Sequence, residues 1–384
     1  MPRAPNDIAD EILIGTEAGD SRVAALAGGR LIDLIVEPRD RPSRVGDIHL
    51  GRVLRLVPGL RAAFVDIGLP RNAFLPFAGA KTLREGESTI AQISEDEAGE
   101  KGARLNLEVS LRGRFAVLLP GGEDRAVSRR IADPARRALL AKIAAAAAPP
   151  GHGLILRTEA MGAAREDIVS DIGLLAALWA EIEASARDSG VPRRLHGDGD
   201  GIARGLRQLA TPGLRVLWVE DETSLAAARR FADRYMPELR PKIAIHASRG
   251  RLFDLHDAAG QIEATRDRQV KLAGGGAIVI DRLEALTAID VDSGSDIGGS
   301  GADIALRTDL DAAAEIPRHL RLRDVVGLVV IDFLRLRRQD QRERVLAALK
   351  RAVSTDRRPV AVLGWTAAGL VELTRGRVNP EDRR

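Results

Sequence analysis

Two apolar strands, each carrying an aspartate and separated by a helix, constrain the fold of this chain more than any other feature. Asp290 lies in the run LTAIDVDSG and Asp332 in VVGLVVIDFL, at positions where a buried strand would carry Val or Ile. The segment between the runs predicts a helix from about 303 to 319, which fits a β-α-β crossover. Because such a crossover places parallel strands side by side with their carboxyl ends at one edge, we expect the two carboxylates to lie close together.

The chemistry of this pair favours a divalent cation. A buried, unpaired carboxylate costs several kcal/mol or takes up a proton, so each aspartate is expected at a strand end with a partner. Oxygen ligands without a nearby His or Cys favour Mg²⁺ or Mn²⁺ over zinc, and such an ion suits phosphodiester hydrolysis. Asp292 is predicted on the same strand face as Asp290, where it can bind the ion or an outer water. The alternative is that both aspartates cap loops or pair with nearby arginines.

The pattern of predicted secondary structure changes near residue 115. Before that point, short β-rich runs broken by Gly and Pro predict two or three strands within 11–38 and a small antiparallel barrel of five strands. After it, strands alternate with helices, and the stretch 194–205 is the clearest linker candidate. The additional helices are expected over 134–148, 166–187, 223–234 and 338–353. A length of 384 residues suggests two to four domains of mixed α and β structure.

Composition excludes several classes of protein. With Cys 0, disulfide scaffolds, thiolate zinc sites and cysteine nucleophiles are ruled out, and the reducing cytoplasm is the expected compartment. We find no apolar run of about 18 residues and no apolar core at the N-terminus, so we expect neither a membrane span nor secretion. Lys occurs six times, so 52 of the 58 basic residues are Arg, whose planar fork suits phosphate oxygens. An ordinary protein surface rich in arginine would have the same composition. The positions of the arginines, and not their number, must therefore show whether the chain binds nucleic acid.

Aromatic residues are rare, yet two of them occupy adjacent strands of the predicted barrel. Phe64 and Phe74 predict either a base-stacking surface for single-stranded nucleic acid or barrel core, and each stacked base contributes roughly 1–3 kcal/mol. Lys101 is a candidate phosphate contact or a solvated surface residue. Four arginines surround the two aromatics in the sequence: Arg52, Arg55, Arg61 and Arg71.

These motifs, in this order, resemble the catalytic half of the ribonuclease E/G family over most of the chain. The matching runs are GLRAAFVDIGLPRNAFLPF, KGARLNLEVSL, GGGAIVIDRLEALTAIDVDSG, HLRLRDVVGLVVIDFL and GLVELTRGRV. The resemblance implies a Mg²⁺-dependent endoribonuclease that cuts single-stranded, often A/U-rich RNA. It also implies an RNase H-like subdomain (1–38 and 200–265) interrupted by an OB-fold barrel (39–112) and a 5′-sensor region (113–199), then a DNase I-like catalytic subdomain (266–384).

The resemblance also implies roles for single residues. Asp290 and Asp332 resemble the family's metal-binding aspartates, with Mn²⁺ as an alternative to Mg²⁺. Asp292 stands where the family usually has an Asn that helps orient the attacking water or the scissile phosphate. The barrel's RNA-contacting residues correspond to Phe64, Phe74 and Lys101. A pocket for a 5′-monophosphate corresponds to Gly113, Val117, Arg129, Arg157 and Thr158.

Three departures from the family pattern affect these expectations. Asp292 replaces an amide by a further negative charge. The cysteine motif of the family's zinc link is absent from the sequence, so we expect no zinc and no zinc-linked dimer, leaving a monomer or another homo-oligomer. Pro359 stands where a further sensor Arg would align, and the neighbouring Arg357 or Arg358 is a possible substitute.

We therefore predict a cytoplasmic Mg²⁺-dependent endoribonuclease of RNA processing or decay, with single-stranded RNA as its partner. The first alternative is a non-catalytic RNA-binding relative that has lost turnover through Asp292 and the missing dimer. The second is an enzyme that hydrolyses a small phosphorylated metabolite, for which the Phe64/Phe74 surface would be superfluous.

Overall fold

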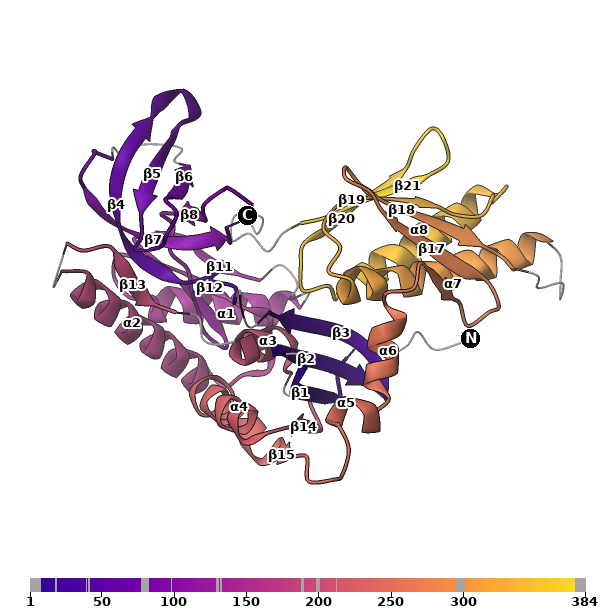
Figure 1. Ribbon diagram of the computed structural model, residues 1–384, viewed down its shortest axis with the longest axis horizontal. Coiled ribbons are helices and arrows are strands. Elements are labelled where there is room, and N and C mark those ends of the chain that lie inside the picture. Colours follow the sequence, from indigo (N-terminus) through magenta and orange to yellow (C-terminus); the bar gives the residue numbers. More distant parts are fainter. Residues whose placement is uncertain are drawn as a thin grey trace. The chain divides into compact units, whose positions relative to one another are not determined.

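The chain folds into two units in a computed structural model that describes residues 8–376, apart from 18, 39, 41, 77–82, 98, 129–130, 132, 188–189, 198–200, 212 and 295–300. Unit 1 contains Met1–Arg41, Gly201–Asp233 and Pro237–Arg384, and unit 2 contains Pro42–Asp200 and Arg234–Met236. Both units mix helices with strands (Figure 1). Within the described ranges, none of the helices is both long and apolar enough to span a membrane.

Unit 2 begins with a closed β-barrel. Its strands are β4 (Ile48–Val57), β5 (Ala62–Asp66), β6 (Ala73–Pro76), β7 (Ser88–Glu95) and β8 (Arg104–Asn106). They follow the order β4-β5-β6-β8-β7, the additional pairing of β4 with β7 closes the ring, and β13 (Arg193–His196) is added beside β4. The barrel predicted from the sequence is therefore present, but β6 and β8 run parallel, so the expectation of a wholly antiparallel barrel is wrong.

The rest of unit 2 is a small sheet covered by two helices. The sheet has the order β11-β12-β10-β9, and α1 and α2 share one apolar core with it. Asp133 caps α1 by accepting hydrogen bonds from the first-turn N–H groups, and a proline follows it at the first helical position, as the Asp-Pro pair predicts. The elements are β9 (Leu111–Arg112), β10 (Ala116–Pro120), β11 (Arg125–Val127), α1 (Pro134–Ala147), β12 (His152–Leu156) and α2 (Arg165–Arg187).

Unit 1 contains two sheets, and the first has the order β15-β14-β1-β2-β3. Its strands are β1 (Glu11–Glu17), β2 (Asp20–Ala27), β3 (Arg30–Glu37), β14 (Val216–Val219) and β15 (Ile243–Ile245). Its helices are α3 (Gly201–Leu209), α4 (Glu222–Tyr235), α5 (Leu252–Leu255) and α6 (Ala258–Ala264). The chain passes from unit 2 to unit 1 between Asp200 and Gly201, inside the predicted linker at 194–205, but β13 and α3 occupy most of that stretch. In α3, Gly205 packs so closely on Val23 that a Cβ there would lie 2.6 Å from that side chain.

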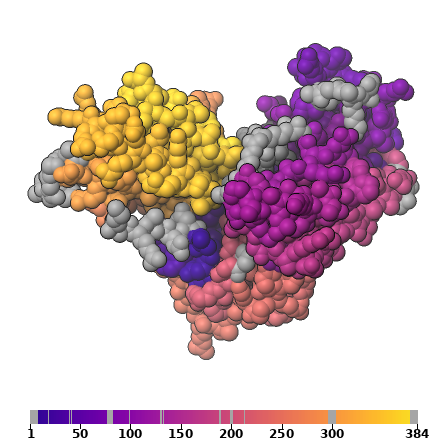
Figure 2. All heavy atoms as spheres, turned by 180° about the vertical axis from the view of Figure 1, so that it is seen from behind, coloured from indigo at the N-terminus to yellow at the C-terminus, as the bar shows by residue number. Residues whose placement is uncertain are grey.

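The second sheet of unit 1 has the order β16-β17-β18-β19-β21-β20. The segment from β16 onward, orange to yellow, forms one continuous body in the space-filling view (Figure 2). Helices α7 and α8 pack on each other and share the buried core of this sheet. The elements are β16 (Gln269–Lys271), β17 (Ala277–Arg282), β18 (Thr287–Asp292), α7 (Gly301–Leu322), β19 (Gly327–Asp332), α8 (Gln339–Val353), β20 (Val360–Trp365) and β21 (Val371–Arg375).

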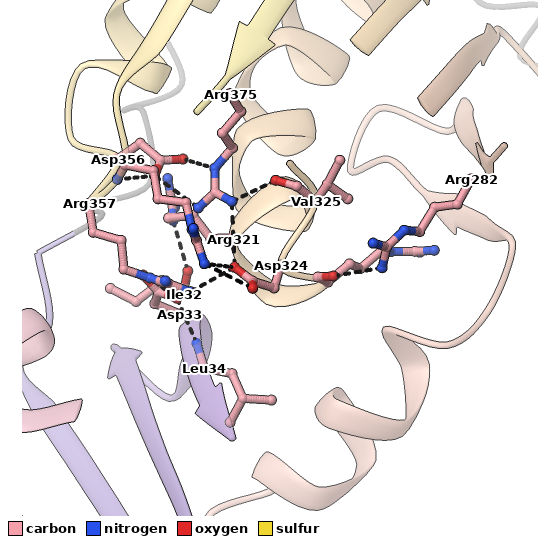
Figure 3. Close-up of polar contacts among 12 residues, drawn as sticks. Ile32, Asp33, Leu34, Arg282, Arg321, Asp324, Val325, Asp356, Arg357 and Arg375 are labelled. Carbon is pink, nitrogen blue, oxygen red and sulfur yellow. Dashed lines mark hydrogen bonds and ion pairs between the residues drawn. The ribbon is translucent and has the colours of Figure 1, made fainter. Parts of the chain in front are cut away.

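A cluster of arginines and aspartates links the two sheets of unit 1 (Figure 3). Arg375 and Asp356, both completely buried, form a bidentate pair with N–O distances of 2.9 and 3.0 Å. Arg375 also donates to the carbonyl oxygen of Val325 at 2.7 Å. Arg357 joins this cluster to the first sheet through an ion pair with the buried Asp33 of β3, at 3.1 Å. Removal of one partner from such a buried pair is strongly destabilising, because it leaves a buried charge without compensation.

Candidate functional site

The two aspartates of the predicted crossover lie side by side. Strands β18 and β19 are parallel neighbours, and Asp290 is the direct register partner of Asp332. Along β18, Ile289 and Val291 are buried whereas Asp290 and Asp292 are exposed, so both aspartates lie on the face opposite the helices. The predicted β-α-β crossover, with α7 between the strands, is therefore confirmed.

The carboxylates of this pair are not committed to protein partners. Among the described residues, Asp290 and Asp332 have no ion pair or side-chain hydrogen bond, so the alternative in which both are paired with arginines finds no support. Asp292 instead accepts a hydrogen bond from the backbone N–H of Gly294 at 2.9 Å. This bond fixes the turn that leaves β18, and among the described residues the other Asp292 oxygen has no hydrogen bond.

A third acidic residue, Asp309 of α7, was not expected from the sequence. It is completely buried, one oxygen accepts from the backbone N–H of Leu334 at 3.0 Å, and the other has no partner among the described residues. Burial raises the pKa of Asp309 to about 7, and the negative charge of Asp332 adds to the effect. The available signal was its helical spacing with Ala312, Ala313 and Ile316, which are all buried.

The carboxylate oxygens of this site are ligands of the kind that hard divalent cations prefer, whereas zinc prefers His and Cys. Among the residues that the structure describes, no three His, Cys, Asp or Glu side chains gather closely enough to form a metal cage. Mg²⁺ is usually held by one or two carboxylates, keeps several waters and binds substrate phosphates directly, so two facing aspartates match its needs. The unpartnered oxygen of buried Asp309, near Asp332 in the described structure, is the kind of orphaned acceptor that a nearby cation compensates.

The aromatic pair lies on the outside of the barrel. Phe64 of β5 and Phe74 of β6 are register partners, and their rings meet edge to face with centroids 6.1 Å apart. Phe64 is 38% exposed and Phe74 is half-buried, whereas the barrel core is formed by their neighbours such as Val65 and Leu75. Neither ring therefore belongs to the core, and the stacking-surface interpretation is the one that their placement supports.

Lys101 belongs to the same barrel. It is exposed, and the next residue, Gly102, packs against the backbone beside β6, where a Cβ would overlap the carbonyl oxygen of Asn72. Only glycine fits this close approach, which brings the lysine's segment against the strand that carries Phe74. The structure thus brings Lys101 into the neighbourhood of the aromatic pair.

Four of the residues predicted to bind a 5′-phosphate lie at one end of the small sheet in unit 2. Arg157, directly after β12, donates to the carbonyl oxygen of Gly113 at 2.7 Å, and Thr158 bonds the hydroxyl of Ser128 at 2.9 Å. Val117 of β10 is buried and pairs with Ile155, two residues before Arg157. Four of the five predicted residues therefore lie together, and the fifth, Arg129, lies outside the described residues.

Asp171 of α2 is a further residue of this region that sequence reasoning missed. Its carboxylate accepts hydrogen bonds from the backbone N–H groups of three consecutive residues, 114–116, at 2.8–3.0 Å. Burial raises the pKa of Asp171, while these bonds act against that rise. A Cβ at Gly113 would lie 2.5 Å from the same carboxylate, which explains the glycine at that position.

The arginines beside Pro359 have structural partners in unit 1. Arg357 pairs with Asp33, and Arg358 forms a bidentate pair with Asp324 at 2.9 Å (Figure 3 shows the cluster). Burial lowers the pKa of Arg358. Burial acts in the same direction on Arg357, but the charges of Asp33 and Asp324 outweigh it and raise the pKa of that guanidinium. The commitment of both arginines to these pairs weighs against either one substituting for a sensor residue at Pro359.

A barrel with outward aromatic rings, combined with a facing pair of strand-end carboxylates, is typical of metal-dependent enzymes that act on nucleic acids. Comparison with known proteins gives the particular family. The family model "Ribonuclease E/G family" matches residues 110–378. Ribonuclease G of Escherichia coli K12 is 34% identical over 96% of this chain and 80% of its own length. Ribonuclease G of Haemophilus influenzae is 30% identical over 96% and 79%, respectively.

The chain belongs to the Ribonuclease E/G family. Ribonuclease E of Escherichia coli K12 is also similar, with 34% identity over 96% of this chain but only 37% of that longer protein. The resemblance predicted from the sequence motifs is thereby confirmed, and with it the assignment to a class of enzymes rather than to a purely structural protein.

Proposed function

We propose that this protein is a Mg²⁺-dependent endoribonuclease that hydrolyses phosphodiester bonds of single-stranded RNA in RNA processing or decay. The observation that carries the proposal is the in-register pair Asp290 and Asp332 on the exposed face of two parallel strands. Family membership supports the same chemistry, because the similar proteins are named Ribonuclease G and Ribonuclease E.

In this proposal Asp290 and Asp332 would hold the ion, which is Mg²⁺ or, as a substitute, Mn²⁺. A bound Mg²⁺ lowers the pKa of a coordinated water and neutralises charge on a phosphoryl oxygen. Asp292, fixed through Gly294, would accept a hydrogen bond from the attacking water and so orient it, and cleavage would leave a 5′-phosphate on the downstream product. The second sheet of unit 1 with α7 and α8 would be the DNase I-like catalytic subdomain, and the first sheet the RNase H-like subdomain.

The barrel of unit 2 would be the OB-fold that binds the RNA. Phe64 and Phe74 stack bases and Lys101 contacts a phosphate, which their exposure and their common location support. Gly113, Val117, Arg157 and Thr158 would form the 5′-monophosphate pocket with Arg129. Arg157 supplies positive charge to this group, and its guanidinium is already oriented by the Gly113 carbonyl oxygen.

The decisive experiment compares the wild type with Asp290→Asn and Asp332→Asn on a 5′-monophosphorylated A/U-rich oligoribonucleotide, with Mg²⁺ or with EDTA. We expect fragments only from the wild type with Mg²⁺. A neutral amide lacks the negative charge of a carboxylate and therefore does not compensate the ion for the loss of a bound water. Both variants should still bind the RNA in a fluorescence-anisotropy assay, since the barrel is untouched. Glu343→Gln, an exposed carboxylate of α8 in the same subdomain, is the matched control and should cut normally.

Three outcomes separate the possibilities. Undiminished cleavage by Asp290→Asn would remove the pair from the mechanism. Binding by the wild type without fragments at any Mg²⁺ or Mn²⁺ concentration would favour the non-catalytic RNA-binding relative, for which Asp292 supplies the specific reason, since an added negative charge repels the scissile phosphate. Absence of RNA binding, combined with release of phosphate from small phosphorylated metabolites, would favour the remaining alternative.

A further inference from the structure

The aromatic pair is the centre of a longer row of side chains across the barrel. Arg55 of β4 is the register partner of Phe64, Phe64 is that of Phe74, and Phe74 is that of Arg104 on β8. Directly opposed residues on neighbouring strands share a face of the sheet. Two cations therefore flank two aromatic rings on four neighbouring strands, although these residues are far apart in sequence.

The pattern of burial places all four side chains on the outer face of the barrel. Arg55, Phe64 and Arg104 are exposed and Phe74 is half-buried. The residues on either side of the two rings and of Arg104 in their strands are all buried, so they point into the core. A bulge between Val53 and Arg55 shifts the register of β4, and it is this shift that places Arg55 opposite Phe64.

The two arginines are available to a ligand. Among the described residues neither Arg55 nor Arg104 takes part in an ion pair. Carboxylates mark the two ends of the row: Glu95 of β7 lies opposite Arg104, and Glu85 accepts a hydrogen bond from the backbone N–H of Leu56 at 2.9 Å. A polyanion is therefore attracted between the arginines and repelled beyond them.

We infer that this row is a binding site for two consecutive nucleotides of single-stranded RNA, with one base on each phenylalanine and the backbone phosphates on Arg55 and Arg104. The RNA then crosses the strands β4, β5, β6 and β8 rather than following one of them. Neighbouring strands lie about 4.8 Å apart, so the four-strand row spans about 14 Å, which is room for two bases, one on each ring, and the flanking phosphates. The inference rests on the proposed function and adds to it Arg55, Arg104 and the direction of the RNA.

Arginines that bind phosphates make the affinity for RNA depend more steeply on salt concentration. Each phosphate neutralised on a single strand contributes about 0.7 to the slope of log affinity against log salt concentration, because counterions are released. Removing one such arginine therefore lowers the slope by about 0.7, whereas removing a stacking ring lowers the affinity and leaves the slope unchanged.

The test measures binding of the full chain to a fluorescein-labelled oligo(U) with a 5′-hydroxyl, in EDTA, at several salt concentrations. Without divalent ions there is no cleavage, and the 5′-hydroxyl leaves the sensor region out of the measurement. We expect Arg104→Gln and Arg55→Gln each to reduce the slope by about 0.7 and the double variant by about 1.4. Arg104→Lys keeps the positive charge and should have the slope of the wild type. Phe64→Ala should lower the affinity about 5- to 150-fold and leave the slope unchanged.

Arg84→Gln is the matched control, because Arg84 is an exposed arginine of the same barrel outside the row. Thermal unfolding of each variant shows whether it is folded. An unchanged slope in Arg55→Gln and Arg104→Gln, with weakened binding by Phe64→Ala, overturns the inference and leaves the proposed function intact. A slope reduced equally by Arg84→Gln also overturns it, because net charge then explains the loss. If Phe64→Ala binds like the wild type, the role of the barrel in the proposed function fails as well.

Discussion

The acid stability of unit 1 depends on Glu315 of α7, whose surroundings hold its carboxylate ionised. Burial alone raises the pKa of Glu315, but hydrogen bonds from His319 and Arg318, together with the charges of Arg318 and Arg30, lower it to about 2 from its ordinary value of 4.5. Arg318 donates to it at 2.7 Å, and Arg30, at the start of β3, pairs with it across the two sheets of unit 1. His319, whose own pKa is lowered by burial, also faces this carboxylate.

The size of the effect follows from linkage. Because the pKa is lower in the folded state, the stabilisation is complete above pH 4.5 and is lost as the pH falls towards 2. The difference between 4.5 and about 2 corresponds to about 3 kcal/mol at neutral pH, of which about 1.4 kcal/mol remains at pH 3. The free energy of unfolding contributed by Glu315 should therefore fall by about 2 kcal/mol between pH 7 and pH 3.

Glu315→Gln tests this prediction, because glutamine keeps the size of the side chain and does not titrate. Urea unfolding is followed by fluorescence in a Trp179→Phe background, in which the remaining tryptophans, Trp218 and Trp365, both report on unit 1. The difference in free energy of unfolding between this background and the same protein carrying Glu315→Gln should shrink by about 2 kcal/mol from pH 7 to pH 3. The exposed Glu263→Gln serves as a control with no such trend. A difference that is the same at both pH values would refute the reasoning.

Other perturbations have equally definite expected results. Arg375→Leu leaves the carboxylate of Asp356 buried and without this partner, so chemical denaturation should show a loss of about 3–5 kcal/mol, partly restored by Asp356→Leu. Gly113→Ala places a methyl group against Asp171 and should reduce the ratio of cleavage rates for 5′-monophosphorylated over 5′-hydroxyl RNA, with little change for the 5′-hydroxyl substrate. The raised pKa of the buried Asp309 means that ionisation of this carboxylate destabilises the wild type as the pH rises from about 4 to about 7. Asp309→Asn removes this titration. The melting temperature of the variant should therefore exceed that of the wild type at pH 8 but not at pH 4.

Local sequence patterns were sufficient for most elements of the fold. The Asp133-Pro134 pair marked the start of α1, and the helical spacing of apolar residues located α2, α4, α7 and α8 to within a few residues. The element missed at 201–209 shows the limit of this reasoning. The stretch 194–205 was predicted as a linker and does contain the boundary between the units, but Gly201 and Gly205 belong to α3, where a Cβ at either position would crowd the first sheet.

The candidate site likewise contains features that the sequence predicted and features that it did not. The sequence pattern predicted that Asp290 and Asp332 end neighbouring parallel strands, because a strand–helix–strand order allows one crossover with one handedness. Asp309 was missed, although its helical spacing with the apolar Ala312, Ala313 and Ile316 places it on the buried side of α7. The sequence pattern could not decide between core and surface for Phe64, because both faces of a barrel strand accept an aromatic ring.

What the amino-acid sequence alone determined was the order of the elements and the chemistry that they carry: the strand-end carboxylates, the paired phenylalanines and the family to which the chain belongs. Only the tertiary structure decided which side chains meet, as in the row Arg55, Phe64, Phe74 and Arg104 and the parallel pairing of β6 with β8. The physical reason is that pairing between distant strands depends on register. The alternation of apolar residues within a strand shows which side chains face the core, but it does not show which distant strand lies alongside or which of its residues stands opposite.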